Sequence, residues 1–247
     1  MSKKIYVEND YDGLYGRFWE SLGELSRDRE EFLNHPKQFD LVCFTGGEDV
    51  SPELYGHKNL GSHCSSARDK REVTVFEMAS KHEIPMTGIC RGSQFLNVMC
   101  GGTMVQHLRQ DHGGYRHGML AADNRVMEVT SSHHQMSVLA KGGTLLGRAE
   151  QLLPLKALVY DGDLEKALAE SGNLWDGRAM VTEAFAYPKQ RIFAVQHHPE
   201  WQDIDEEAAQ WTLDMIARIC WEQETRQRTL DEIMDVFGCV PLYSRRE

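Results

Sequence analysis

Hydrophobic residues in this chain fall into short apolar runs that alternate with segments of helical spacing. The runs predict buried strands, and they lie at residues 4–7, 39–44, 84–89, 125–129, 157–160, 179–187 and 191–195. The segments with a three- and four-residue apolar repeat predict helices, at residues 11–25, 69–82, 93–100 and 208–220. Strands that alternate with helices favour an α/β fold, in which helices cover both faces of a mostly parallel sheet.

Two segments interrupt this alternation. Residues 21–38 are short and charged, and residues 106–124 are polar and rich in histidine, which is typical of a loop. No internal repeat, low-complexity tract or linker divides the chain. A length of 247 residues fits one large α/β domain, so we expect a single domain over residues 1–247.

Composition and charge exclude several classes of function. The formal net charge of −11 argues against a nucleic-acid-binding surface. No apolar run is long enough to cross a bilayer or to form a signal peptide. The six cysteines are scattered without paired or zinc-like spacing, which indicates reduced thiols and a cytoplasmic location.

The most informative motif is Gly-Ile-Cys-Arg-Gly at residues 88–92, where a predicted strand meets a predicted helix. A cysteine on such a sharp turn is presented above the sheet, and the flanking glycines tolerate close backbone contacts. The N-terminus of the following helix favours a thiolate. The pentapeptide alone is equally compatible with a buried cysteine that only packs, so Cys90 needs further support as a nucleophile.

That support comes from residues that could serve as base and oxyanion donors. His198 and Glu200 follow the strand at residues 191–195 and, two apart in an extended segment, project to the same side. A carboxylate beside imidazole selects its tautomer and stabilises the imidazolium. The backbone N–H groups of Gly47 and Arg91 are candidates for an oxyanion hole.

Together these motifs resemble the class I glutamine amidotransferase superfamily, and most closely its γ-glutamyl-γ-aminobutyrate hydrolase branch, a peptidase C26-like group. The resemblance covers residues 39–200. Its motifs are Gly-Ile-Cys-Arg-Gly-Ser-Gln at 88–94 and Gln-His-His-Pro-Glu at 196–200. Supporting segments lie at residues 45–52, 55–56, 68–69, 101–103 with Gln106, and 129–135.

The resemblance implies a flavodoxin-like three-layer sandwich and a hydrolase of γ-glutamyl amide bonds that acts through a glutamyl thioester. It implies Cys90 as nucleophile, His198 as general base and acid, and Glu200 as its orienting carboxylate, with Gly47 and Arg91 as backbone oxyanion donors. It further implies that the glutamyl group contacts four residues, namely Gln94, His133, Gln135 and Met136. No metal or organic cofactor is expected.

Some residues depart from the family pattern. The charged segment at 21–38 stands where relatives have another strand, so the first lobe is expected to be trimmed. Thr130 replaces the usual asparagine, Ser132 stands where an apolar residue is common, and His197 where an aromatic is common. These changes leave the identity of the amine leaving group open.

The sequence is compatible with functions other than a hydrolase. A glutaminase subunit would pass ammonia to a separate synthetase, since nothing in this chain resembles a synthetase domain. A flavodoxin-like redox or chaperone-like protein would not need His198 and Glu200, and a non-catalytic binding module would tend to lose a member of the triad. The sequence leaves the oligomeric state open, a homodimer included.

A metal site is the remaining alternative, because several histidines are close in sequence. The candidates were His107, Asp111, His112 and His117, with the doublets at 133–134 and 197–198. Since no spacing matches a recognised ligand set, we expect a polar loop without a metal. The cysteines at 43, 100 and 220 are expected to pack, Arg68 or Asp69 to support the site, and Trp201 and Trp211 to pack in the core or at its rim.

Overall fold

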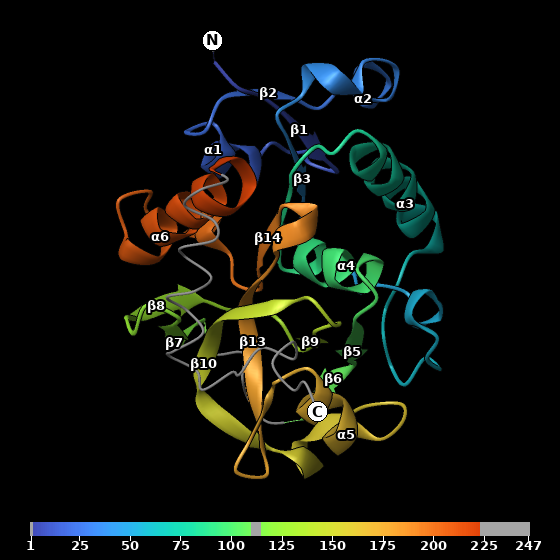
Figure 1. Cartoon of the computed structure of the whole chain (residues 1–247), viewed down its shortest axis with the longest axis vertical. Coiled ribbons are helices and arrows are strands. Elements are labelled where there is room, and N and C mark those ends of the chain that lie inside the picture. The colour runs from blue at the N-terminus through green and yellow to red at the C-terminus, as the bar shows by residue number, and fades with distance from the viewer. Residues whose placement is uncertain (1, 110–114, 223–247) are drawn as a thin grey trace, which may run out of the picture.

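A computed structural model describes residues 2–109 and 115–222. Its centre is a sheet whose parallel half carries the motifs singled out above (Figure 1). The parallel strands, in spatial order, are β2 (Glu24–Ser26), β1 (Lys4–Glu8), β3 (Leu41–Phe44), β4 (Met86–Ile89) and β14 (Ile192–Val195). The carboxyl ends of β3, β4 and β14 therefore meet at one edge of the sheet.

Antiparallel strands extend the sheet beyond β14. These are β13 (Arg178–Tyr187), β10 (Thr144–Pro154), β7 (Arg116–Ala121) and β8 (Val126–Thr130), with β12 (Leu174–Trp175) paired to β13. Two small ladders accompany them, β5 (Thr103–Val105) with β9 (Met136–Val138) and β6 (His107–Leu108) with β11 (Leu158–Val159).

Helices cover the two faces of the parallel half (Figure 1). They are α1 (Gly16–Trp19), α2 (Arg29–Asn34), α3 (Ser66–Lys81), α4 (Arg91–Met99) and α6 (Glu207–Ile216), while α5 (Leu164–Glu170) lies by the antiparallel strands. Alternate residues of β1 point to opposite faces: Ile5 and Val7 share a core with α6, and Tyr6 shares the other with α3 and α4.

This arrangement confirms the predicted flavodoxin-like α/β sandwich with a mostly parallel central sheet. The assignment of the whole of residues 1–247 to one domain stays a prediction, because residues 223–247 lie outside the described part.

The local predictions near the N-terminus need correction. The helix expected at residues 11–25 is only the short α1, and the lobe is not trimmed of its strand, because β2 pairs in parallel with β1. Asp10 explains the difference. Its carboxylate accepts hydrogen bonds from the N–H groups of Tyr15 and Gly16 and binds Arg27, so the chain folds around a buried carboxylate.

The expected loop at residues 106–124 was also wrong in part, since it contains β6 and β7. β6 is only two residues long, and β7 contains His117 and Gly118, so neither carries a clear apolar pattern and pairing with distant strands determines both.

Candidate active site

Cys90 lies on a strained turn between β4 and α4. Its φ and ψ are 52° and −111°, an unusual conformation for a residue with a side chain. Its N–H donates to the carbonyl of Val195 on β14, 2.9 Å away. A Cβ on Gly92 would lie 2.2 Å from the carbonyl oxygen of Phe44, so only glycine fits there. The turn is the elbow that the motif predicts.

His198 and Glu200 lie beside this turn because β14 pairs in parallel with β4. His198 Nδ1 is 2.6 Å from Glu200 Oε1, and both side chains are almost fully buried. Burial alone would lower the pKa of His198, but hydrogen bonds and charge interactions with Cys90 and Glu200 raise it to about 10. The expected extended segment is wrong in detail: Pro199–Trp201 is a 3₁₀ turn, which still brings the carboxylate to the ring.

The glycine pair after β3 lies against the same histidine. A Cβ on Gly46 would come within 3.2 Å of His198 Cε1, and Gly47 has a φ of 138° that favours glycine. The Arg68 guanidinium donates to the carbonyls of Thr45 and Gly46 and pairs with Glu48 and Glu72. Arg68 therefore holds the turn that carries Gly47.

Arg91, whose N–H is the other predicted oxyanion donor, has a fully buried side chain. Its guanidinium pairs with Asp69 and Glu72 of α3 and donates to the carbonyl of Glu48. Burial lowers the pKa of Arg91 to about 9, although the neighbouring carboxylates oppose this change. Asp69 and Arg68 thus occupy the supporting positions expected from the sequence.

The residues predicted to hold the glutamyl group are all buried. Gln94 Nε2 donates to Gln196 Oε1 at 3.1 Å, which places Gln94 beside the segment that carries His198. Gln135 donates to Ser62 and to the carbonyl of Gln106, and Met136 lies in an apolar cluster with Val105. The His133 ring faces Glu183 on β13. Contact of these residues with substrate stays a prediction, and for Met136 the burial favours contact through its backbone alone.

Sequence reasoning missed three contacts of His198. Ser132 Oγ is 3.1 Å from Nε2, the Trp201 ring stacks on the imidazole at 3.8 Å between centroids, and the Tyr15 ring is 6.2 Å away. Burial raises the pKa of Tyr15 well above its usual value. The unusual serine at 132 was a sequence signal that could have pointed to its contact with His198. Trp201 was expected only to pack in the core or at its rim, and Tyr15 belongs to no motif.

The remaining candidates are placed as follows. Asp111 and His112 lie outside the described residues, and so does Cys239. The rings of His107 and His134 contact each other through Nδ1 atoms 3.2 Å apart, whereas His117 contacts Glu183. Cys43 and Cys220 are buried in the core, and the cysteines at 43, 64, 90 and 100 are free thiols.

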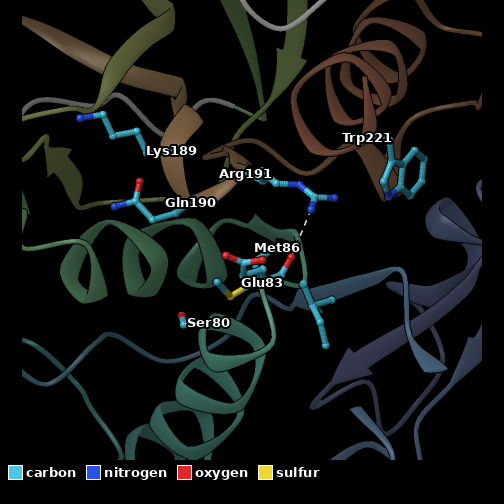
Figure 2. Close-up of a pocket in the computed structure, with 8 residues that line it drawn as sticks. Ser80, Glu83, Met86, Lys189, Gln190, Arg191 and Trp221 are labelled. Atoms are coloured by element: carbon cyan, nitrogen blue, oxygen red, sulfur yellow. Dashed lines mark hydrogen bonds between the residues drawn. The ribbon is translucent and has the colours of Figure 1, made fainter. Parts of the chain in front are cut away.

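A separate cavity of about 500 Å³ lies at the opposite, amino-terminal ends of β4 and β14 (Figure 2). Its lining includes Glu83, Met86, Arg191 and Trp221, and Arg191 donates to the carbonyl of Glu83 across it. Ligands of open α/β sheets bind at the carboxyl ends of the strands, where Cys90 and His198 lie, so this cavity is not part of the candidate site.

Comparison with known proteins agrees with this geometry. The sequence pattern of the family described as Peptidase C26 matches residues 24–200. The chain belongs to the peptidase C26 family. It is therefore a hydrolase acting on carbon–nitrogen bonds, of the class I glutamine amidotransferase type.

Individual proteins show the same likeness. The chain is 29% identical over 176 residues to the glutamine amidotransferase-like protein YvdE of Lactococcus lactis, covering 69% of this chain and 70% of YvdE. It is 27% identical to a carbamoyl phosphate synthase small chain of Nitratidesulfovibrio vulgaris, over 75% of this chain and 41% of that one. A glutamine amidotransferase of Thermotoga maritima shares the fold, with a TM-score of 0.51, 16% identity and coverage of 97% of this chain and all of that one.

In the described residues, no helix is long and apolar enough to span a membrane.

Proposed function

We propose that the chain hydrolyses γ-glutamyl amide bonds, in glutamine or a γ-glutamyl amine, through a glutamyl thioester on Cys90. The observation that carries the proposal is the contact of His198 with both Cys90 and Glu200 at the carboxyl ends of β4 and β14. Because these partners raise the pKa of His198 to about 10, the histidine holds its proton at neutral pH and can give it to a leaving nitrogen.

The first half-reaction follows from this charge arrangement. Cys90 Sγ attacks the γ-carbonyl carbon, and the carbonyl oxygen becomes an oxyanion near the N–H groups of Gly47 and Arg91. When the tetrahedral intermediate collapses, the carbon–nitrogen bond breaks and the leaving nitrogen takes the proton from His198 Nε2. The products are an amine, or ammonia from glutamine, and a thioester.

In the second half-reaction, the neutral His198 accepts a proton from water at Nε2, and the resulting hydroxide attacks the thioester carbonyl. The carbon–sulfur bond breaks, glutamate leaves, and Cys90 Sγ is restored beside the protonated His198. Glu200, held at Nδ1, fixes the tautomer in both steps. Trp201 stacks on the face of the His198 ring and Ser132 contacts its edge, so both restrict rotation of the imidazole.

The test is amine release from a panel of γ-glutamyl amines and glutamine. Wild type should release amine, Cys90→Ala should lose activity by about 10³-fold or more, and Cys64→Ala, which removes an exposed thiol, should keep it. Equal release by wild type and Cys90→Ala would overturn the mechanism.

A second candidate is a glutaminase subunit that passes ammonia to a separate synthetase. The likeness to a carbamoyl phosphate synthase small chain over three quarters of this chain favours it. Full turnover of a γ-glutamyl amine by the isolated chain supports the stand-alone hydrolase. Turnover confined to glutamine and weak in isolation supports the subunit. The free thiols of Cys43, Cys64, Cys90 and Cys100 support a reducing, cytoplasmic compartment for either function.

A further inference from the structure

A second cluster of reactive side chains lies on the antiparallel half of the sheet. His117 on β7, His133 between β8 and β9, and Glu183 on β13 bring one ligand atom each to within 4.8 Å of one another. Glu183 and His133 are buried and His117 is partly exposed. The cluster has no residue in common with the Cys90, His198 and Glu200 trio.

The hydrogen bonds of His133 constrain how its ring is protonated. Its Nδ1 is 2.8 Å from the carbonyl oxygen of Gln135, which can only accept, so Nδ1 carries a proton. Nε2 then faces Glu183 Oε1 at 3.3 Å. A neutral imidazole nitrogen and a carboxylate oxygen both present lone pairs there, so either a second proton or a cation must lie between them.

Glu183 Oε1 also faces the second histidine. His117 Nε2 lies 2.9 Å from the same oxygen. Two ligand atoms that each lie about 2.0–2.2 Å from a tetrahedral Zn²⁺ are roughly 3.3 Å apart. The distances from Glu183 Oε1 to the Nε2 atoms of His117 and His133 are close to this value. Two imidazole nitrogens and one carboxylate form a recognised zinc ligand set, and an imidazole whose other nitrogen donates to a backbone carbonyl is the usual supporting contact of a metal-bound histidine.

We propose that His117, His133 and Glu183 bind a divalent first-row transition metal, with Zn²⁺ the best match to this donor set. Mg²⁺ and Ca²⁺ prefer oxygen ligands, which makes them poor occupants. Such a metal would link β7 and β13 to the segment that carries Ser132, whose hydroxyl contacts His198. Its role would therefore be to hold this wall of the candidate active site, apart from the reaction itself.

The experiment measures Zn²⁺ binding to the whole chain after removal of metals by a chelator. Isothermal titration should show one site in wild type and an unchanged site in Cys90→Ala, because this variant removes the Cys90 thiol, which together with His198 could also capture zinc. His117→Ala and Glu183→Gln should bind about 100-fold more weakly or worse, beyond the usual effect of losing a supporting contact. His134→Ala is the matched control, since it removes the adjacent histidine that contacts Asp49, and should bind like wild type.

Two further measurements distinguish loss of the metal site from misfolding of a variant and from binding at a thiol. Zn²⁺ should raise the melting temperature of wild type and Cys90→Ala but not of His117→Ala, whose partly exposed position favours correct folding. Co²⁺ bound to wild type should lack the intense charge-transfer absorption of a thiolate ligand. Absence of saturable binding to wild type, unchanged binding by folded His117→Ala, or loss of binding in Cys90→Ala would each overturn the proposal. If wild type binds no zinc, a proton shared between His133 Nε2 and Glu183 Oε1 accounts for their contact instead. None of these readouts depends on turnover, so they are independent of the proposed function.

Discussion

At the scale of single residues, the environment of His198 determines what the candidate site can do. The ring has Glu200 at Nδ1, Ser132 at Nε2 and Trp201 stacked on its face, and it also hydrogen-bonds to Cys90. The sequence motifs predicted Cys90, His198 and Glu200, whereas Ser132 stood out only as a departure from the family pattern. Ser132 and Trp201 reach the ring because the segment after β8 and a 3₁₀ turn fold over it, and local patterns do not encode such contacts.

The first prediction concerns the proton on His198. Its pKa should be near 10 in the folded free enzyme, because its hydrogen bonds to Cys90 and Glu200 outweigh burial. NMR titration of the histidine rings measures this directly. Glu200→Gln and Cys90→Ala should each lower the pKa, whereas Cys64→Ala should not change it.

The same pKa gives a signed dependence of stability on pH. A raised folded-state pKa stabilises the protein below the unfolded value near 6.5, and this contribution is lost as pH rises toward 10. Denaturant unfolding from pH 7 to 10 should show a loss that is smaller in Cys90→Ala. An equal loss in both proteins would contradict this assignment of the charge.

The second prediction concerns His197, which is fully buried and contacts Thr212 Oγ1 at 3.3 Å. Burial lowers its pKa to about 3, so the folded state excludes a proton that the unfolded state binds below pH 6.5. In wild type, this proton exclusion should lower the free energy of unfolding by roughly 1.4 kcal/mol per pH unit as the pH falls from 6 to 4. His197→Phe, which replaces the imidazole with an apolar aromatic ring, should remove this loss.

Urea unfolding of wild type and His197→Phe across that range is the measurement. Thr212 still donates to the carbonyl of Ala208 in the variant, so little stability should be lost at pH 8. Parallel stability curves for the two proteins below pH 6 would show that His197 is not the group responsible.

At the scale of elements, the elbow is fixed by the contact of α3 with α4. Arg91 on α4 is enclosed with the carboxylates of Asp69 and Glu72 on α3, and Arg68 on α3 holds the glycine turn after β3. One charged cluster therefore ties together the elements that carry Cys90 and Gly47. From the sequence alone, the run of charges at residues 68–72 is equally compatible with a solvated helix start. The structure shows a supporting role instead, because Asp69 and Glu72 are buried against Arg91 of α4.

The third prediction is that Arg91→Met destabilises the fold by about 3–5 kcal/mol, since removing one partner leaves buried carboxylates uncompensated. Equilibrium urea unfolding gives the value. Arg116→Met is the control, because Arg116 makes ion pairs with Glu128 and Glu206 at the exposed surface and its loss should have a much smaller effect. Comparable losses for the two variants would refute the role given to the buried cluster.

At the scale of the whole molecule, strand order creates the site. Residues 90 and 198 are far apart in sequence, and they meet because β4 and β14 pair in parallel. Apolar runs and helical spacing were sufficient to predict the α/β class, most buried strands and the carboxyl edge that holds the chemistry. They did not reveal the short β2, the long β10 or the histidine-containing β7, because pairing with distant strands stabilises these elements. Glu183 was missed for the same reason: a lone acid in an apolar strand gains partners only across the sheet.

The central claim is that Cys90 forms a glutamyl thioester, and trapping that intermediate tests it most directly. Protein quenched with acid during turnover of a γ-glutamyl substrate should carry the mass of one glutamyl group on the peptide that contains Cys90, as measured by mass spectrometry. Hydroxylamine should release it as the hydroxamate, and Cys90→Ser should show no such thioester. A glutamyl group found on another cysteine, or turnover without any adduct on Cys90 and undiminished in Cys90→Ala, would contradict the account.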